Sequence, residues 1–217
     1  MLRMLRSLGL LLWIWGSASI LPARSCEAEV RINEILADPG RDWNKDGVVS
    51  ARDDEWLEIV NHGTTPLSLD DLRVSDAANV FRFGFSGTLN PGAVLAVYGD
   101  QSVTWESANG LTAVGLSLNN AGDTIRLWRI AGTDTVLVDE HTFGSHEVLD
   151  DRSTGPYPDG GDNWVAFDSI NPYTGTTPPL GTGCPPTPGT NNGCPTAVEG
   201  TTWSRVKALY VAREPRH

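Results

Sequence analysis

Short runs of hydrophobic residues, some of them alternating with polar residues, follow one another along the chain from Glu29 onward. Alternation with a period of two, or a continuous apolar run of four to eight residues, is typical of β-strands. Turn-forming sequences rich in Gly, Asn, Asp and Pro separate these runs. The pattern predicts strands at residues 30–36, 56–62, 72–75, 80–85, 93–98, 124–130, 135–141 and 163–167.

The spacing of these strands predicts an all-β fold. No segment between them has the pattern of a long amphipathic helix. No repeat of fixed period occurs either, which argues against a solenoid or a propeller. Many short strands joined by turns are typical of an immunoglobulin-like β-sandwich. We therefore expect such a sandwich over residues 29–192.

Composition and charge narrow the range of partners. The 217 residues are 40% hydrophobic, which suits one globular domain with its termini. The 16 basic and 27 acidic side chains give a net charge of −11, and the part between the two basic ends of the chain is more acidic still. Such a surface repels phosphate, so the charge argues against a nucleic-acid partner.

The N-terminal segment predicts export. Arg3 and Arg6 precede an apolar run at residues 8–15, and small residues follow at 16–19. This order is typical of a signal peptide, and the apolar run is too short for a permanent transmembrane helix. We assign residues 1–25 to the signal peptide. We therefore expect a secreted or cell-envelope protein with no transmembrane helix after cleavage.

The three cysteines gain meaning from this predicted export, because the compartments outside the cytosol are oxidising. Cleavage after Ala18 and cleavage after Ser25 both remain open, and a further interpretation makes Cys26 the carrier of a lipid. Cys184 and Cys194 flank a loop rich in Pro, Gly and Asn. We expect them to close this loop as a disulfide, which leaves Cys26 free or modified.

Residues 193–217 form a C-terminal tail of different composition. Trp203, Val206 and Tyr210 recur at helical spacing, and the segment around them has more basic than acidic residues. Two interpretations are open. The tail is either a sorting or anchoring signal that docks on an export or envelope component, or a short helix packed on the domain or a disordered end.

The segment 42–54 carries the strongest chemical signal. Oxygen-bearing side chains occupy loop positions one, three, five, nine and twelve, and Gly47 occupies position six. This is the spacing of an EF-hand-type calcium loop, because calcium takes six to eight oxygen ligands and a tight turn brings alternate residues inward. The expected ligands are Asp42, Asn44, Asp46, the carbonyl of Val48, Ser50, Asp53 and, as a neighbour that can replace Asp53, Asp54.

An aspartate at position twelve, where glutamate is usual, makes the loop similar to the calcium loops of dockerin modules. The alternative interpretation is an acidic surface turn without an ion. We expect calcium to act as a structural cofactor that stabilises this long loop, because a ligand that binds only the folded state favours that state.

The body of the chain resembles the lamin tail domain in the form found in exported bacterial proteins. The most characteristic match is residues 118–127, Leu-Asn-Asn-Ala-Gly-Asp-Thr-Ile-Arg-Leu. The other matching stretches are 30–39, 54–61, 67–76, 89–92, 97–99, 152–164 and 186–191. The tryptophan often present in the third of these stretches is absent here. The resemblance covers residues 29–192.

This resemblance implies an immunoglobulin-like sandwich that serves as a binding or attachment module, in a setting beside surface hydrolases or nucleases. It implies no catalytic residues, and a fold does not fix a function. Bacterial members often carry an insertion rich in Asp and Asn after the first strand, which is the place of the calcium loop here. An envelope protein or a glycan is the expected partner.

Catalytic motifs are absent from the sequence. It has no GxSxG, HExxH or CxxC, and exposed loop positions explain His141 and His146 better than a zinc site does. We therefore expect a non-enzymatic module. The alternative is a calcium-dependent hydrolase, or an accessory domain of one, that uses the loop with Asp54, Glu55 and Glu58.

Two tryptophans stand in polar segments that the pattern assigns to loops. Trp43 and Trp105 either contact a glycan ring or another protein, or cover the interiors of their loops. Three tryptophans lie in predicted strands, and most of them are expected in the core; these are Trp56, Trp128 and Trp164.

Overall fold

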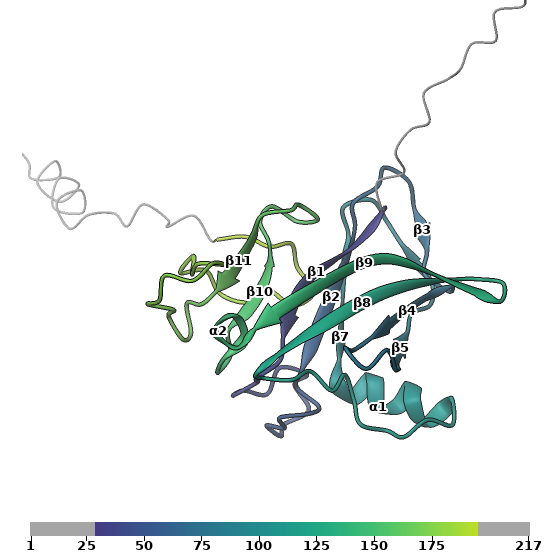
Figure 1. Ribbon diagram of the computed structural model, residues 1–217, viewed down its shortest axis with the longest axis horizontal. Helices are drawn as coiled ribbons and strands as arrows, with labels where there is room; N and C mark the ends of the chain where they lie inside the picture. Colours follow the sequence, from purple (N-terminus) through teal and green to yellow (C-terminus); the bar gives the residue numbers. More distant parts are fainter. Residues whose placement is uncertain (1–28, 195–217) are drawn as a thin grey trace, which may run out of the picture.

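The computed structural model describes residues 29–194 (Figure 1). The predicted signal peptide, Cys26 and the residues from 195 to 217, which include the predicted C-terminal helix, lie outside the described residues. Within the described part, no helix has both the length and the apolar character needed to cross a membrane.

The larger sheet has five antiparallel strands in the order β11-β10-β1-β2-β7. Their bounds are β1 (Val30–Leu36), β2 (Trp56–Asn61), β7 (Val94–Tyr98), β10 (Ser153–Pro156) and β11 (Trp164–Phe167). The register places Ile59 of β2 opposite Ile32 of β1 on one side and opposite Leu95 of β7 on the other. We call this the first sheet.

The second sheet has four antiparallel strands in the order β5-β4-β8-β9. Their bounds are β4 (Leu72–Ser75), β5 (Phe81–Gly84), β8 (Gly122–Ala131) and β9 (Asp134–Gly144). A small two-stranded sheet joins β3 (Leu67–Ser68) to β6 (Thr88–Leu89). The long β8–β9 hairpin extends beyond the other strands (Figure 1).

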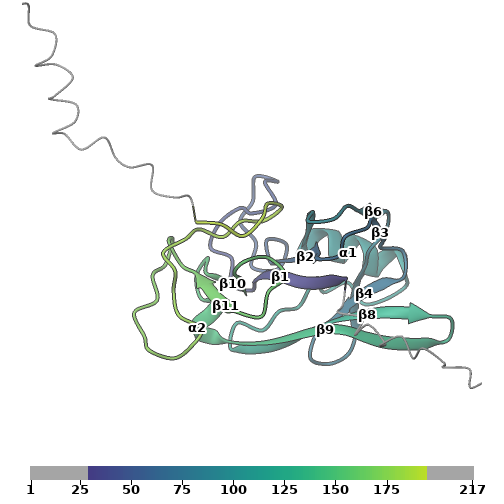
Figure 2. The same cartoon turned by 90° about the horizontal axis from the view of Figure 1, so that it is seen from above.

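The two large sheets lie in separate layers, with β1 and β2 in one layer and β8 and β9 in the other (Figure 2). Side chains from both sheets fill the space between them and form one hydrophobic core. The first sheet supplies Ile32, Ile35, Leu57, Ile59 and Val97, and the second supplies Leu72, Val74, Ile125, Leu127 and Phe143. The structure is mostly β, and its antiparallel sheets are consistent with the predicted immunoglobulin-like sandwich.

The structure adds elements that the hydrophobic pattern did not predict. Helix α1 (Gly99–Ala108) packs against β5 and β7, and helix α2 (Ser145–Val148) follows β9. The buried positions of α1 are Gly99, Ser102 and Glu106, so the helix has no apolar stripe to reveal it. Strand β10 has the sequence Ser-Thr-Gly-Pro and is fully buried, although Thr154 is its only residue of a type enriched in strands.

Candidate functional site

The first half of the predicted calcium loop folds back on its own side chains. Asp42 accepts hydrogen bonds from the backbone N–H of Asp46 (3.1 Å) and of Gly47 (2.9 Å). Asn44 Oδ1 accepts one from Asp46 N–H at 3.0 Å, and Asp46 Oδ1 accepts one from Val48 N–H at 2.8 Å. Gly47 has a φ of 94°, a left-handed conformation that favours glycine. The oxygens of positions one, three and five thus face the inside of one turn.

Asp54 joins the two ends of this loop by hydrogen bonds. It is fully buried, and its Oδ1 accepts hydrogen bonds from the backbone N–H of Trp43 (2.7 Å) and Asn44 (3.0 Å). Its Oδ2 accepts one from Ser50 N–H at 2.7 Å. Both oxygens are therefore already engaged with the two ends of the loop, which gives Asp54 a structural role that its sequence position did not reveal.

Asp53 lies at the end of the loop beside a cation. The Arg52 guanidinium approaches its carboxylate at 2.6 Å, and Ser50 Oγ donates to it at 3.2 Å. The hydrogen bond from Arg52 holds the pKa of Asp53 below its ordinary value. A carboxylate that stays ionised suits a calcium ligand, although here it faces Arg52.

The predicted ligands fit calcium in their chemistry, and the first half of the loop also has the turn that such a site needs. Every predicted ligand offers oxygen, and Asp42, Asn44 and Asp46 already face one turn. Within residues 29–194, no three side chains of His, Cys, Asp or Glu converge as a metal site requires. The amide and carbonyl oxygens in the predicted set are therefore essential to the proposed ligand sphere.

Trp43 docks the loop on the domain. Its Nε1 donates a hydrogen bond of 2.7 Å to Asp151 Oδ1, the same oxygen that accepts the N–H of Gly40 at 2.8 Å. Its ring lies 6.0 Å from the ring of Trp56, which is fully buried on β2. Of the two interpretations of Trp43, the structure supports the one in which it covers the loop interior.

Two buried glutamates hold the C-terminal strap, by which we mean residues 184–194. Glu34 accepts hydrogen bonds from Ser153 Oγ (2.5 Å) and from the N–H and Oγ1 of Thr187 (3.1 and 2.8 Å). Glu58 lies directly opposite Glu34 in the register of β1 and β2, and its Oε2 accepts the Gly189 N–H at 2.7 Å. Both glutamates are 0% exposed.

Amides complete this network. Asn33 Nδ2 donates to Glu58 Oε1 and to Asp159 Oδ1, at 2.8 Å each. Asn192 Nδ2 donates to the carbonyls of Asn33 and Pro156, at 2.9 Å each. The strap and the calcium-type loop both lie on the side of β1 and β2 that faces away from β8 and β9 (Figure 2). The predicted disulfide between Cys184 and Cys194 is present and closes the strap.

Burial changes the titration of both glutamates. It raises the pKa of Glu34 to about 7, against the hydrogen bonds from Ser153 and Thr187, which lower it. Burial and, to a lesser extent, the nearby charge of Glu34 raise the pKa of Glu58 to about 8. The sequence carries one signal for this network, which is a glutamate within each of two largely hydrophobic strands, Glu34 and Glu58. The strap residues that they bind, Thr187 and Gly189, lie 153 and 131 positions away and carry no such signal.

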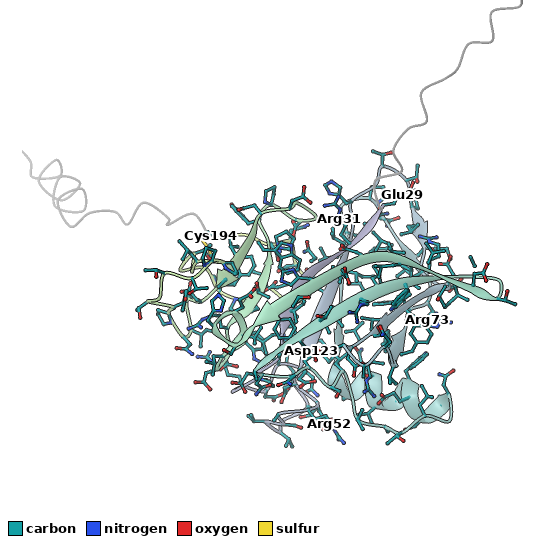
Figure 3. All side chains as sticks on the ribbon, in the orientation of Figure 1. Glu29, Arg31, Arg52, Arg73, Asp123 and Cys194 are labelled. Carbon is teal, nitrogen blue, oxygen red and sulfur yellow. A yellow bond between two sulfur atoms is a disulfide. The ribbon has the colours of Figure 1, made fainter. Side chains whose placement is uncertain are left out.

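Glu55 belongs to a different environment. It is 6% exposed, accepts the Leu118 N–H at 3.2 Å, and lines an open pocket of about 670 Å³ together with Arg52, Ser117 and Asp123. Figure 3 labels Arg52 and Asp123 at this end of the molecule. Burial raises the pKa of Glu55 to about 8. Asp54, Glu55 and Glu58 thus enter three separate hydrogen-bond networks and do not form one acidic site.

The structure shows where His141, His146 and Trp105 lie. The prediction of exposed loop positions is wrong for both histidines: His141 lies in β9, His146 lies in α2, and both are half-buried. His141 stacks face to face on Trp164, with ring centroids 3.2 Å apart, whereas His146 Nε2 lies 3.2 Å from the Pro178 carbonyl. The two histidines therefore have separate partners. Trp105 was assigned to a polar loop, and this is wrong: it lies in α1, with its ring 6.3 Å from Phe83.

Comparison with known proteins gives one match. A family model described as Lamin Tail Domain matches residues 23–145, which is more than half of the chain. No curated protein and no solved structure matches the chain. The family match ends at the start of α2, and the strands beyond it, β10 and β11, are hydrogen-bonded into the first sheet.

Proposed function

Because the chain belongs to the lamin tail domain family, we propose that it is a secreted or cell-surface binding and attachment module, without enzymatic activity, that calcium stabilises. Export rests on the signal-peptide pattern of residues 1–25. The expected partner is a protein or a glycan of the cell envelope. The net charge of −11 argues against nucleic acid.

The observation that carries the calcium part of the proposal is the inward turn of the loop. Asp42, Asn44 and Asp46 already present oxygens to one turn. The remaining proposed ligands are the Val48 carbonyl, Ser50 and Asp53. The predicted set also includes Asp54, to which we now give the role of fastening the loop, since both of its oxygens accept backbone N–H groups.

The placement of the acidic residues supports a binding role over a catalytic one. Glu58 holds the strap, Asp54 holds the loop, and Glu55 accepts the N–H of Leu118. A general acid–base pair needs two groups within reach of one substrate, and these three carboxyl groups serve separate backbone segments. The calcium ion in this proposal supplies structural stability and neutralises carboxylate charge.

Retention on cell envelopes tests this proposal. The purified chain is incubated with envelopes of the producing organism in millimolar calcium, sedimented and quantified. We expect saturable retention, and equal retention by Asp162→Asn, because Asp162 is a 96% exposed acid that pairs with Arg31 and is not among the proposed calcium ligands. Failure to bind envelope protein or glycan at any concentration contradicts the proposal. Calcium-dependent turnover of an ester or glycoside that folded Asp46→Ala lacks favours the hydrolase.

A further inference from the structure

The outward face of the second sheet carries a row of aromatic and basic side chains. Leu72 and Val74 of β4 point into the core, so Arg73 between them points outward. Trp128 of β8 lies directly opposite Arg73 in the register, and Leu137 of β9 lies directly opposite Trp128. Directly opposed residues share one face of a sheet. Figure 2 shows β8 and β9 at the border of the molecule, on the side away from β1 and β2.

Trp128 lies along this face. Its Nε1 donates a hydrogen bond of 2.9 Å to Ser75 Oγ, and Ser75 is two residues beyond Arg73 on β4. The indole therefore leans from β8 toward β4, and the side chain is half-buried. Part of the side chain therefore stays accessible, and exposed surface of an aromatic ring can stack on the C–H groups of a ligand.

Trp105 reaches the same face because β5 has a glycine there. Gly84 lies directly opposite Arg73. A Cβ atom on Gly84 would lie 2.7 Å from Trp105 Nε1 and 2.9 Å from Arg73 Nε, so the missing side chain lets the indole and the guanidinium come together. In the view of Figure 3, Arg73 lies between β8 and α1. We call Trp105, Arg73, Trp128 and Leu137 the tryptophan–arginine band.

The charge of Arg73 is not neutralised by a neighbouring carboxylate. Its NH1 donates to the backbone carbonyls of Asp70 (3.0 Å) and Leu72 (2.7 Å), and no acidic side chain of the described residues lies within 4.0 Å of its guanidinium nitrogens. The other arginines of the second sheet each pair with an acid, and these are Arg82, Arg126 and Arg129. An unpaired guanidinium binds a carboxylate well, because its fork matches the two oxygens.

We propose that the tryptophan–arginine band binds an acidic polysaccharide, with sugar rings stacked on Trp105 and Trp128 and one uronate carboxylate held by Arg73. The net charge of −11 repels the other carboxylates of such a chain, so the contact is confined to the stacked rings and to this one carboxylate, at a guanidinium that no acidic side chain of the described residues neutralises. This inference rests on the proposed attachment function and names its ligand class.

From β5, where Trp105 approaches Gly84, to Leu137 on β9, the band crosses three strand spacings, about 14 Å. This length suits a short run of sugar rings. A stable protein interface takes about 20–30 residues from each partner, whereas the band has four.

Isothermal titration calorimetry tests the proposal with the full chain and three probes, which are oligomers of galacturonate, of mannuronate and of hyaluronan. We expect saturable binding of at least one probe and weaker binding of its methyl ester. Arg73→Gln lowers the affinity at least tenfold, and Leu137→Ala, at a 43% exposed position, lowers it severalfold without disturbing the fold. Arg129→Gln is the matched control. Arg129 follows Trp128 on β8, lies opposite Leu72 of β4 and pairs with Asp71.

Three results overturn the proposal: no saturable binding of any probe, equal affinity of Arg73→Gln and the parent chain, or an equal loss in Arg129→Gln. A protein ligand whose capture depends on Arg73 while all sugars are ignored also overturns it. If Arg73→Gln is retained on envelopes as well as the parent chain is, acidic polysaccharides are not the ligand, but the proposed attachment function is still supported. The two proposals therefore fail separately.

Discussion

The backbone N–H of Gly189 donates a hydrogen bond of 2.7 Å to Oε2 of Glu58, across 131 positions of the chain. Thr187 bonds Glu34 in the same way, so two buried carboxyl groups of the central strands hold the strap. The strap is therefore a built part of the sandwich. The strength of this attachment is measurable, because each side chain in it can be changed separately.

Glu34→Ala removes the acceptor for Ser153 Oγ and for two donors of Thr187. Each buried donor left without a partner costs about 1–3 kcal/mol, so we expect a loss of about 3 kcal/mol or more in the free energy of unfolding. Urea denaturation measures it. Asp162→Ala is the control: it removes the 96% exposed partner of Arg31, a surface ion pair, and should change the stability by less than about 1 kcal/mol. A similar small loss in Glu34→Ala contradicts the account of the strap.

Stability should fall as the pH rises from about 5 to about 8. Burial raises the pKa of Glu34 to about 7 and of Glu58 to about 8, whereas both groups titrate near about 4.3 in an unfolded chain. Between these values the folded state keeps protons that the unfolded state has released, so rising pH favours unfolding. At about 1.4 kcal/mol for each pH unit over which a group stays protonated only in the folded state, the two groups together give a decline of several kcal/mol, on the order of 7.

Urea midpoints at several pH values measure this decline. Glu58→Gln removes one of the titrating groups, so its stability should depend less on pH than that of the parent chain. Glu55, whose pKa burial also raises to about 8, contributes in the same direction and keeps part of the slope. A stability that rises between pH 5 and pH 8 in the parent chain is the opposite of this expectation.

Removing the disulfide should weaken the strap. Cys184 and Cys194 are separated by 10 positions, and closing a loop of this size in the unfolded chain is worth about 2.5–3 kcal/mol. We expect the double change Cys184→Ser and Cys194→Ser to lower the free energy of unfolding by about this amount. The reduced parent chain provides the matched comparison. If the oxidised and reduced chains unfold at the same urea concentration, the disulfide has no role in stability.

Asp54 and Asp46 should differ in how their loss depends on calcium. Asp54→Ala leaves three buried or half-buried N–H groups without an acceptor, so it should destabilise the chain by about 3 kcal/mol with or without the ion. Asp46→Ala removes one exposed bond to Val48 N–H and one proposed ligand. Its effect should appear only in calcium. Thermal melting of both variants, with calcium and with chelator, separates the two roles.

Strands with a clear hydrophobic pattern were predicted from the sequence. Elements that depend on contacts with residues far away in the chain were missed. Strand 30–36 and strand 72–75 were predicted with their observed bounds, because apolar residues recur in both and turn-forming residues follow both. Strand β10 was missed because Ser153 and Thr154 are buried for the hydrogen bonds they donate to Glu34 and Glu147. Neither hydrophobicity nor strand propensity reports such a role.

The candidate sites follow the same division. The spacing of the loop was visible because its oxygens lie within 13 positions, and Gly47 has the predicted special conformation. The fastening role of Asp54 and the docking of Trp43 on Asp151 depend on segments far apart in the chain. The tryptophan–arginine band depends on the register of four strands with a helix, which the local pattern does not specify.

The melting temperature of the full chain as a function of calcium concentration tests the central claim most directly. At about one hundred times its dissociation constant, a ligand that binds only the folded state adds about 2.7 kcal/mol, which corresponds to a rise of about 5–10 °C for a chain of this size. We predict such a rise in the parent chain and none in Asp46→Ala, with nearly equal melting temperatures for both in chelator. No rise in the parent chain, or an equal rise in Asp46→Ala, would contradict a calcium-stabilised module.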